Sequence, residues 1–217
     1  SVSLRYIKKW DKDLIHVVDS AQLDFEKLME DGVLDWSKNW VPVEATDPIN
    51  GQPITFYSQL DTTAIKEYIV NPPGAEREYD GIELSLKKRY SNGWAINASY
   101  VYANSKGLIS TGRGGESLGT SDLFADPNYH TNGDGRLEGE RRHQFKVQGL
   151  MKGPWGINVS GYLRAFSGYR YTRMIRSRDI GVSLGGGTQT INAEARGASA
   201  YPFETNLDLR LEKSFKI

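Results

Sequence analysis

An all-β fold, in the form of a segment of an antiparallel transmembrane β-barrel, is predicted by three features of this 217-residue sequence. About six stretches alternate apolar and polar residues with a period of two, which is the period of a β-strand. In the central hairpin, the apolar side carries no charge from Phe145 to Met151 or from Trp155 to Ala165. Long connections alternate with short turns along the chain, as they do in outer-membrane barrels.

The first predicted strand lies within residues 1–18, where Val2, Leu4 and Tyr6 alternate with polar residues. The pattern then becomes charged, as expected of a strand that leaves an apolar zone for water. Because the strand pattern is already present at the first residue, and because residues 211–217 still alternate, we expect the chain to be a segment of a longer polypeptide.

Residues 19–78 form the first long connection, which we expect to be extracellular. Within it, residues 22–30 are compatible with a short helix, and residues 53–57 and 64–70 with short strands. Connections of this length are functional or disordered, and the aromatic residues argue against disorder. These aromatic side chains are candidates for ligand binding by stacking on a sugar or clamping a peptide, although packing of the loop on itself is favoured: Trp36, Trp40, Phe56 and Tyr57.

Alternation resumes in two predicted strands at residues 79–91 and 94–105. Residues 91–93 (Ser-Asn-Gly) are predicted to form a three-residue turn that pairs Tyr90 with Trp94. A loop with an odd number of residues keeps the apolar faces of both strands on the same side of the sheet.

Residues 106–140 form the second long loop, which is rich in glycine and has no periodic pattern. Asp126–Gly135 has the oxygen-rich, glycine-punctuated character of a calcium loop, but it departs from the EF-hand pattern. Turn chemistry explains the same residues without an ion. His16, His130 and His143 do not have metal-ligand spacing. The sequence therefore predicts no metal site and leaves a calcium ion in this loop open.

The central hairpin is predicted at residues 141–152 and 155–172, with Lys152, Gly153 and Pro154 as a three-residue turn that pairs Met151 with Trp155. Its apolar face is uncharged, whereas its other face holds lysine, glutamine, asparagine and arginine side chains. Arms of about ten residues with this contrast are typical of a transmembrane β-hairpin.

A third long loop is predicted at residues 173–201, and the last strand at residues 202–216. The three long loops thus lie at one end of the strands, which we expect to be extracellular, and the two short turns lie at the other, which we expect to be periplasmic. A soluble antiparallel sheet shows the same alternation when one face covers a core. It has no reason to sort its loops by length.

Aromatic residues lie near both ends of the predicted strands, as the two interfacial belts of a membrane barrel require. The predicted membrane-interface residues are Tyr90, Trp94, Trp155, Tyr102, Tyr169 and Tyr171. The polar face carries charges of both signs, which we expect to face a plug or a water-filled lumen. These residues are Glu83, Lys87, Arg89, Lys146, Arg164, Glu204, Asp208, Arg210 and Glu212.

Composition excludes several classes of protein. Basic and acidic residues balance at 27 each, so no strong field favours nucleic acid. The chain has no cysteine, which excludes disulfides and thiolate chemistry. It has no apolar run long enough for a transmembrane helix. The sequence offers no catalytic constellation, so we expect neither an enzyme nor a cofactor.

Five runs of residues carry a resemblance to a known family: RRHQFK at 141–146, PWGINVSG at 154–161, FSGYRYT at 166–172, YDGIEL at 79–84 and LDLRLEKSF at 207–215. They resemble strand motifs of TonB-dependent outer-membrane receptors. The branch that looks closest is the one whose plug follows a carboxypeptidase-regulatory-like domain. The resemblance covers residues 79–217 well and residues 1–18 loosely, and it does not cover the first long loop.

The resemblance implies a barrel of about 22 strands around a plug, of which this chain would supply about six from the C-terminal half, without the plug domain. It implies a receptor in the outer membrane of a Gram-negative bacterium, in contact with lipid. The receptor would capture a ligand with its extracellular loops and import it with energy from a TonB-type periplasmic partner. Two alternatives stay open: a soluble secreted β-sheet module that binds carbohydrate or another ligand, and a passive porin-like channel.

Overall fold

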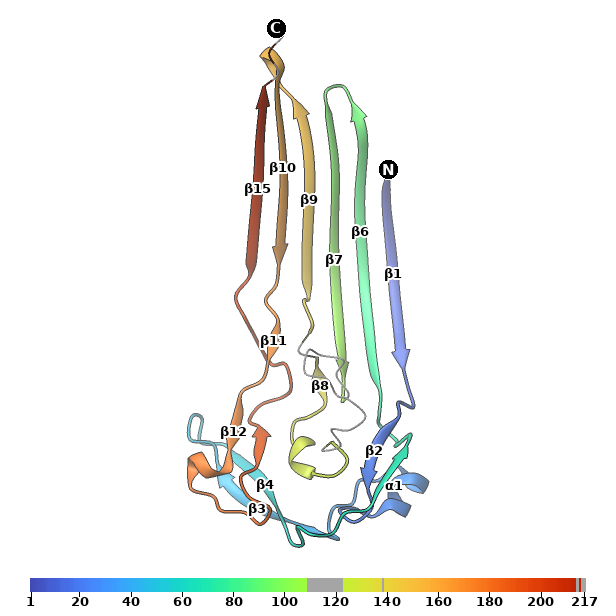
Figure 1. Cartoon of the computed structure of the whole chain (residues 1–217), viewed down its shortest axis with the longest axis vertical. Helices are drawn as coiled ribbons and strands as arrows, with labels where there is room; N and C mark the ends of the chain where they lie inside the picture. The colour runs from blue at the N-terminus through green and yellow to red at the C-terminus, as the bar shows by residue number, and fades with distance from the viewer. Residues whose placement is uncertain (109–122, 138, 214, 216–217) are drawn as a thin grey trace.

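The computed structural model describes residues 1–108, 123–137, 139–213 and 215. Its main element is a tall antiparallel sheet with the strand order β1-β6-β7-β9-β10-β15, which Figure 1 shows side by side. A short strand, β8, continues the sheet beside β7. The strands are β1 (Val2–Asp11), β6 (Arg77–Ser91), β7 (Trp94–Gly107), β8 (Gly135–Arg136), β9 (His143–Lys152), β10 (Ile157–Phe166) and β15 (Glu204–Lys213).

Each of the six segments predicted from alternation corresponds to one of the long strands, but some bounds differ, and β6 and β7 each extend two residues beyond their predicted segments. β1 ends at Asp11 rather than near residue 18, because the chain turns there and residues 16–19 join a separate small sheet as β2. β10 ends at Phe166, and Arg170–Tyr171 form the separate strand β11. The predicted strands had merged these neighbours because short breaks leave the alternation visible.

The turn between β6 and β7 differs from the prediction. Ser91 pairs with Trp94, so the turn consists of Asn92 and Gly93 alone. Both have left-handed backbones, with φ of 50° and 82°, as a type I′ turn requires. The predicted three-residue turn is therefore wrong. A turn with an even number of residues would place the apolar faces of β6 and β7 on opposite sides of the sheet. A β-bulge between Lys88 and Ser91 adds one residue to β6 and brings the two apolar faces back to the same side.

The turn between β9 and β10 differs from the prediction in the opposite way, because it is longer. Met151 pairs with Val159 and not with Trp155, so that prediction is wrong. Residues 153–157 form the loop and include the 3₁₀ turn η2 (Pro154–Gly156), in which Trp155 has a φ of 56°. The loop still has an odd number of residues, so the apolar faces of the two strands remain on one side.

The long connections are not structureless, because they fold together at one end of the sheet. We call this region, comprising residues 12–76, 123–137 and 167–203, the loop cap. Figure 1 shows it as a layer of small elements below the long strands. These elements are β2 (His16–Asp19), α1 (Phe25–Asp31), β3 (Trp40–Thr46), β4 (Pro53–Gln59), β5 (Glu67–Val70), η1 (Pro127–Tyr129), β11 (Arg170–Tyr171), β12 (Met174–Arg176), η3 (Ser177–Ile180), β13 (Thr190–Asn192) and β14 (Ser199–Ala200), together with β8.

Local chemistry explains α1, the single α-helix of the described residues. The Asp24 carboxylate accepts a hydrogen bond from the backbone N–H of Lys27 and caps the helix at its start. Gly32 ends it in the left-handed conformation, with a φ of 70°. The predicted helix at residues 22–30 is thus present but begins later, at Phe25. Among the described residues, no helix is long and apolar enough to cross a membrane.

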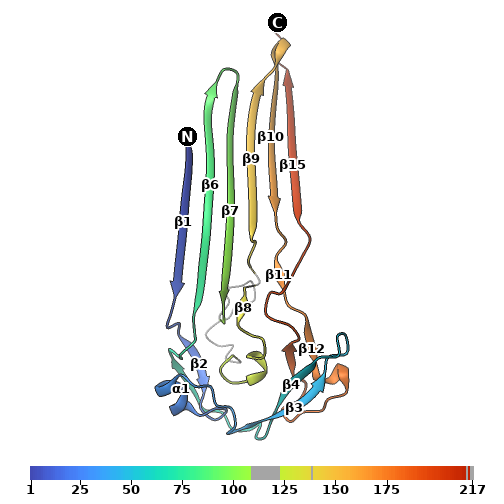
Figure 2. The ribbon, with the colours of Figure 1, turned by 180° about the vertical axis from the view of Figure 1, so that it is seen from behind.

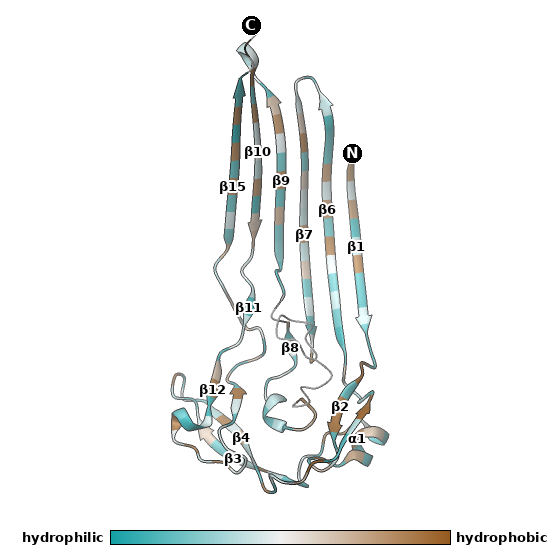
Figure 3. Ribbon diagram, viewed as in Figure 1, coloured by the Kyte–Doolittle hydropathy of each residue, from teal (hydrophilic) through white to brown (hydrophobic). Residues whose placement is uncertain are grey.

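The hydrophobic core lies in the loop cap and not behind the sheet. One cluster contains Val18, Leu28 and Phe124, and a second contains Phe56, Ile175 and Ile191. The long strands contribute almost no fully buried apolar side chain. Their hydropathy instead changes from residue to residue, which Figure 3 shows as alternating brown and teal bands.

Contacts between distant loops hold the cap together. Arg173 forms an ion pair with the buried carboxylate of Asp47, which joins the third loop to the first. The Asn128 side chain accepts from the backbone N–H of Tyr57 at 2.8 Å, which joins the second loop to the first. Figure 2, from behind, shows the same arrangement, with β3 and β4 beside β12 and with α1 and β2 at the other side. The first loop therefore spans the width of the sheet.

Candidate functional site

The outer face of the sheet is a continuous apolar surface. Leu84 lies between Leu4 and Tyr100, and Val147 lies between Ala98 and Leu163, because these residues are direct partners across neighbouring strands. No part of the described chain covers this face, and Leu209 is 72% exposed. The residues of the band are Val2, Leu4, Tyr6, Ile82, Leu84, Leu86, Ile96, Ala98, Tyr100, Tyr102, Phe145, Val147, Gly149, Met151, Ile157, Val159, Gly161, Leu163, Ala165, Leu207, Leu209 and Leu211.

The height of this band matches a membrane. On β7 it extends from Trp94 to Tyr102, which at about 3.3 Å per residue is roughly 26 Å along the strand. A tilt of about 40° would reduce this to roughly 20 Å across a membrane, close to the apolar band of about 25 Å in outer-membrane barrels.

Polar groups mark the end of the apolar band toward the loop cap. The Tyr6 hydroxyl donates to Asp80 at 2.8 Å, and the Trp10 indole N–H donates to Glu78 at 3.0 Å. Lys8 lies 3.6 Å from the same Asp80 carboxylate. An aromatic ring with one bonded polar tip is the arrangement expected where an apolar layer meets water. Sequence analysis did not predict Tyr6 or Trp10 as membrane-interface residues, although both continue the alternation that begins at Val2.

At the short-turn end, the outer face carries Trp94, over which the Lys88 ammonium lies at 3.9 Å from the ring centroid. Trp155 is 83% exposed at the tip of its turn. Tyr90, however, does not lie on this face. The bulge after Lys88 reverses its direction, and Tyr90 lines the inner side of the sheet with Leu150. The prediction that Tyr90 continues the apolar face is therefore wrong.

The remaining predicted interface aromatics are Tyr102, Tyr169 and Tyr171. Tyr102 is an outer-face residue whose ring lies 5.3 Å from the His143 ring. Tyr169 lies beyond the end of β10, with the Arg141 guanidinium 3.8 Å from its ring centroid. Tyr171 is in β11 and packs against Tyr201. Of the three, Tyr102 alone lies in a strand of the main sheet.

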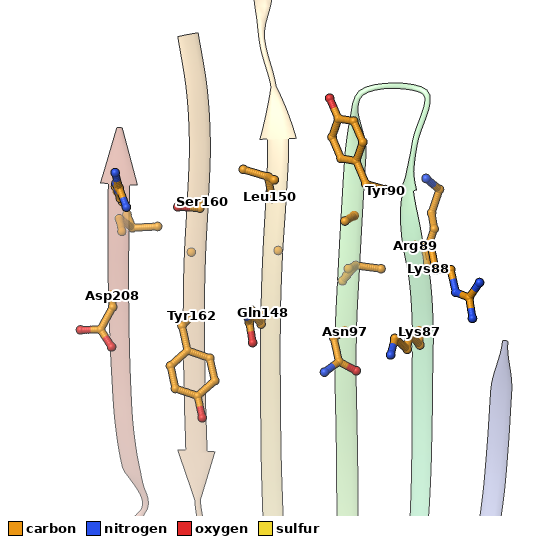
Figure 4. A pocket seen from close by; sticks show the side chains of 16 residues that line it. Lys87, Lys88, Arg89, Tyr90, Asn97, Gln148, Leu150, Ser160, Tyr162 and Asp208 are labelled. Atoms are coloured by element: carbon orange, nitrogen blue, oxygen red, sulfur yellow. The ribbon is translucent and has the colours of Figure 1, made fainter. Parts of the chain in front are cut away.

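The inner face of the sheet is polar and concave. Figure 4 shows Lys87, Asn97, Gln148, Tyr162 and Asp208 from five strands, and each is the cross-strand partner of the next. They line a hollow of about 830 Å³. Charges of both signs lie on this wall, and some are paired across or along the strands. Two of these pairs are Arg5 with Glu83 at 3.6 Å and Arg210 with Glu212 at 2.6 Å.

An antiparallel sheet with an uncovered apolar face and a wet polar face matches a membrane barrel wall, and the comparison with protein families agrees. A family model described as outer membrane beta barrel domain matches residues 30–176, which is more than half of the chain. The chain belongs to this family. Neither the curated proteins nor the solved structures that were compared contain a match.

Membership places this outer membrane β-barrel protein in the outer membrane and confirms the predicted fold class. Its apolar face is therefore in contact with membrane lipid. The alternative of a soluble secreted binding module is wrong, because that module would need a second layer to cover its apolar face. The structure has its buried core in the loop cap instead.

The loop aromatics of this barrel protein pack inside the cap. Phe56 is fully buried in the second cluster, and Trp40 is 4% exposed. The Trp36 ring lies 5.5 Å from the His130 ring, and Tyr57 is only partly exposed. The prediction that these side chains contact a ligand is wrong for Phe56 and Trp40, since a buried ring has no free face to offer. Packing of the loop on itself was the favoured interpretation.

The loop from Asp126 to Gly135 uses its oxygen atoms for hydrogen bonds within the protein. The Asp126 carboxylate accepts from the backbone and side-chain nitrogens of Asn128, both at 2.8 Å. Within the described part of the chain, no group of three or more histidine, aspartate or glutamate side chains is arranged to hold a metal ion.

His130 makes the stability of the loop cap depend on pH. Burial beside Phe124 and Trp36 lowers the pKa of His130, although its Nε2–H donates to the Leu123 carbonyl. The folded cap therefore holds neutral imidazole, and the unfolded chain takes up a proton below its ordinary pKa of about 6.5. The contribution of His130 is present above that pH and is lost as pH falls through the folded pKa.

We expect hydrogen exchange in α1 and β2 to accelerate as pH is lowered from 7.5 to 5, after correction for the intrinsic exchange rate. His130→Gln should flatten this dependence, because glutamine keeps a donor for the Leu123 carbonyl and does not titrate. An unchanged pH dependence in His130→Gln would assign the effect to another group.

Proposed function

We propose that this chain is part of an outer-membrane receptor that captures a ligand with its loop cap and imports it with TonB-derived energy. In this proposal the loop cap is extracellular and the short turns are periplasmic. The polar inner wall contacts a plug that belongs to another part of the receptor, and further strands cover the free edges of β1 and β15, since unpaired edges are not tolerated in lipid.

The order of the loop cap carries this proposal. Two hydrophobic clusters and the buried Asp47–Arg173 pair hold three sequence-distant loops in one arrangement. A preformed surface binds without the entropic cost of ordering loops, which favours recognition.

A passive porin-like channel is the second candidate, because the polar inner wall supports it as well as it supports a receptor. The inner wall is polar, hollow and lined by charges of both signs, as a water-filled lumen is. The two candidates differ in whether the lumen is open and whether transport needs an energy source.

The test uses the complete natural polypeptide in planar lipid bilayers bathed in potassium chloride. A receptor with a plug is expected to show no steady conductance until mild urea displaces the plug, and to form a crosslink with a TonB-type protein in cells. Steady conductance without urea, together with no such crosslink, would overturn the receptor proposal and favour the porin-like channel.

A further inference from the structure

Unpaired buried polar atoms are concentrated at one place in the structure. Within the described residues, five buried side-chain nitrogen or oxygen atoms have no hydrogen-bond partner, and four of them belong to Glu140, Arg141 and Arg142. The fifth is the indole nitrogen of Trp40. Buried polar groups are almost always hydrogen-bonded, so a cluster of exceptions marks a place where a polar partner would be favoured.

Glu140 lies where the barrel wall meets the loop cap, in the gap of the β7 ladder between β8 and β9. Its side chain is 1% exposed. One carboxylate oxygen, Oε2, accepts from the backbone N–H of Ser105 at 2.8 Å and so replaces a strand partner. On either side of this contact, Ala103 N donates to Arg142 O and Leu137 N donates to Ser105 O. The other oxygen, Oε1, accepts no hydrogen bond from the described residues.

Three guanidinium groups converge on this oxygen, which they contact as ion-pair partners without a hydrogen bond. Arg136 Nη1 lies 3.6 Å from Glu140 Oε1, Arg142 Nε lies 3.7 Å from it, and Arg170 Nε lies 3.6 Å from it. These distances are too long for hydrogen bonds, which in charged pairs are about 2.7–2.9 Å. The arginines come from β8, from the residue before β9 and from β11, so the fold brings them together from three separate segments.

The charges of this cluster do not balance. Three guanidinium groups face one carboxylate, which leaves a formal charge of +2. Within the described residues, Glu140 is the one carboxylate in ion-pair distance of these three arginines. The neighbouring Arg141 is paired instead with Glu204 at 2.9 Å. The arginine side chains are 31%, 23% and 16% exposed, so solvent and solutes reach the cluster from one side.

We propose that Arg136, Arg142 and Arg170 form a binding site for a single oxyanion, a phosphate or carboxylate group. In this site the Glu140 carboxylate holds the three arginines together. Guanidinium groups bind such oxyanions through paired N–H donors. The bound anion neutralises the excess charge and accepts hydrogen bonds from the partly exposed guanidinium groups, whereas Arg142 Nε is buried beside Glu140. This site does not depend on the proposed transport function.

Binding is tested on the complete protein in neutral detergent, by isothermal titration with inorganic phosphate at constant ionic strength. We expect saturable binding to the unmodified protein and a dissociation constant at least about tenfold higher for Arg170→Gln, since one charge-assisted contact is lost. Arg164→Gln is the matched control, because Arg164 lies on β10 outside the cluster and should leave binding unchanged. No saturable binding of either inorganic phosphate or short-chain phosphatidylglycerol, or equal binding by Arg170→Gln, would overturn the proposal.

Glu140→Gln separates an anion site from a purely structural cluster. The amide oxygen can still accept from Ser105 N, while the charge of the cluster rises from +2 to +3. An anion site therefore predicts tighter phosphate binding, whereas a structural cluster predicts only a lower melting temperature. If Glu140→Gln does not fold, the comparison of Arg170→Gln with Arg164→Gln still decides.

The source of the anion is resolved by repeating the titration with short-chain phosphatidylglycerol. A response to the lipid that Arg170→Gln removes, without a response to inorganic phosphate, would assign the site to a lipid headgroup. A response to inorganic phosphate alone would assign it to a free anion.

Discussion

Replacing Phe56 with alanine is expected to lower the free energy of unfolding of the loop cap by about 3–5 kcal/mol. Phe56 is fully buried and, with Ile175 and Ile191, forms the second hydrophobic cluster. These residues come from the first and third loops, so the cavity left by the ring would loosen two loops at once. Hydrogen exchange in β12 and β13, measured on the complete protein, should increase, while exchange in the long strands should not.

Ile49→Ala is the matched control for this experiment. Ile49 lies in the connection between β3 and β4 and is 75% exposed, so its truncation removes little packing. Equal exchange in the two variants would contradict the central role of Phe56. The experiment also tests whether Phe56 acts through packing. If it does, any loss of ligand binding in Phe56→Ala should occur together with faster exchange in the loops.

Replacing Val147 with arginine is expected to destabilise the folded barrel by about 2–4 kcal/mol, the cost of a cation near the middle of the lipid-facing band of a barrel. Val147 lies on the central strand β9, and its two cross-strand partners among the described residues, Ala98 and Leu163, are apolar and cannot pair with the new charge. The urea midpoint for unfolding in lipid vesicles, followed by the change in electrophoretic mobility on unfolding, should fall accordingly.

The neighbouring substitution Gln148→Arg controls for size and charge. Gln148 lies on the inner face between Asn97 and Tyr162, where the same cation remains in water. We expect a change within about 1 kcal/mol, as for a solvated surface position. If both substitutions had the same large effect, the assignment of the two faces would be wrong.

The two faces of the sheet were largely predictable from the sequence. A period of two places alternate residues on opposite faces, so the apolar band and the polar wall were predictable from β6 to β15 without coordinates. Tyr90 is the exception. Asn92 and Gly93 favour a two-residue type I′ turn, and the bulge that this turn requires moves Tyr90 to the inner face. The Asn-Gly pair indicates this two-residue turn in the sequence, but the three-residue turn was predicted instead because it keeps the apolar faces on one side.

The loop cap was much less predictable. Its helix and the strands near residues 53–57 and 64–70 are present with shifted bounds, because they depend on local capping and propensity. The packing of Phe56 against Ile175 and the pairing of Asp47 with Arg173 join segments more than one hundred residues apart. Nothing in local periodicity reports such contacts, so aromatic residues that build the cap resembled exposed ligand contacts in the sequence.

The arginine cluster around Glu140 was missed for the same reason. Arg141 and Arg142 were noted as part of a strand motif, but Arg136 and Arg170 had no visible relation to them. The three guanidinium groups meet because β8, β9 and β11 converge where the wall joins the cap. A glutamate among arginines carries no distinctive spacing in the sequence.

The sequence by itself determined the six alternating strands, the faces of nearly all their residues and the separation of long loops from short turns, and these features predicted a membrane barrel wall. These properties follow from the period of the strand and from the contrast between lipid and water, and both act on every second residue. Tertiary structure alone decided that the long loops form an ordered cap, that Phe56 and Trp40 are buried, and that three arginines share one carboxylate. Those outcomes depend on contacts between distant segments, whose partners are fixed only when the whole chain packs.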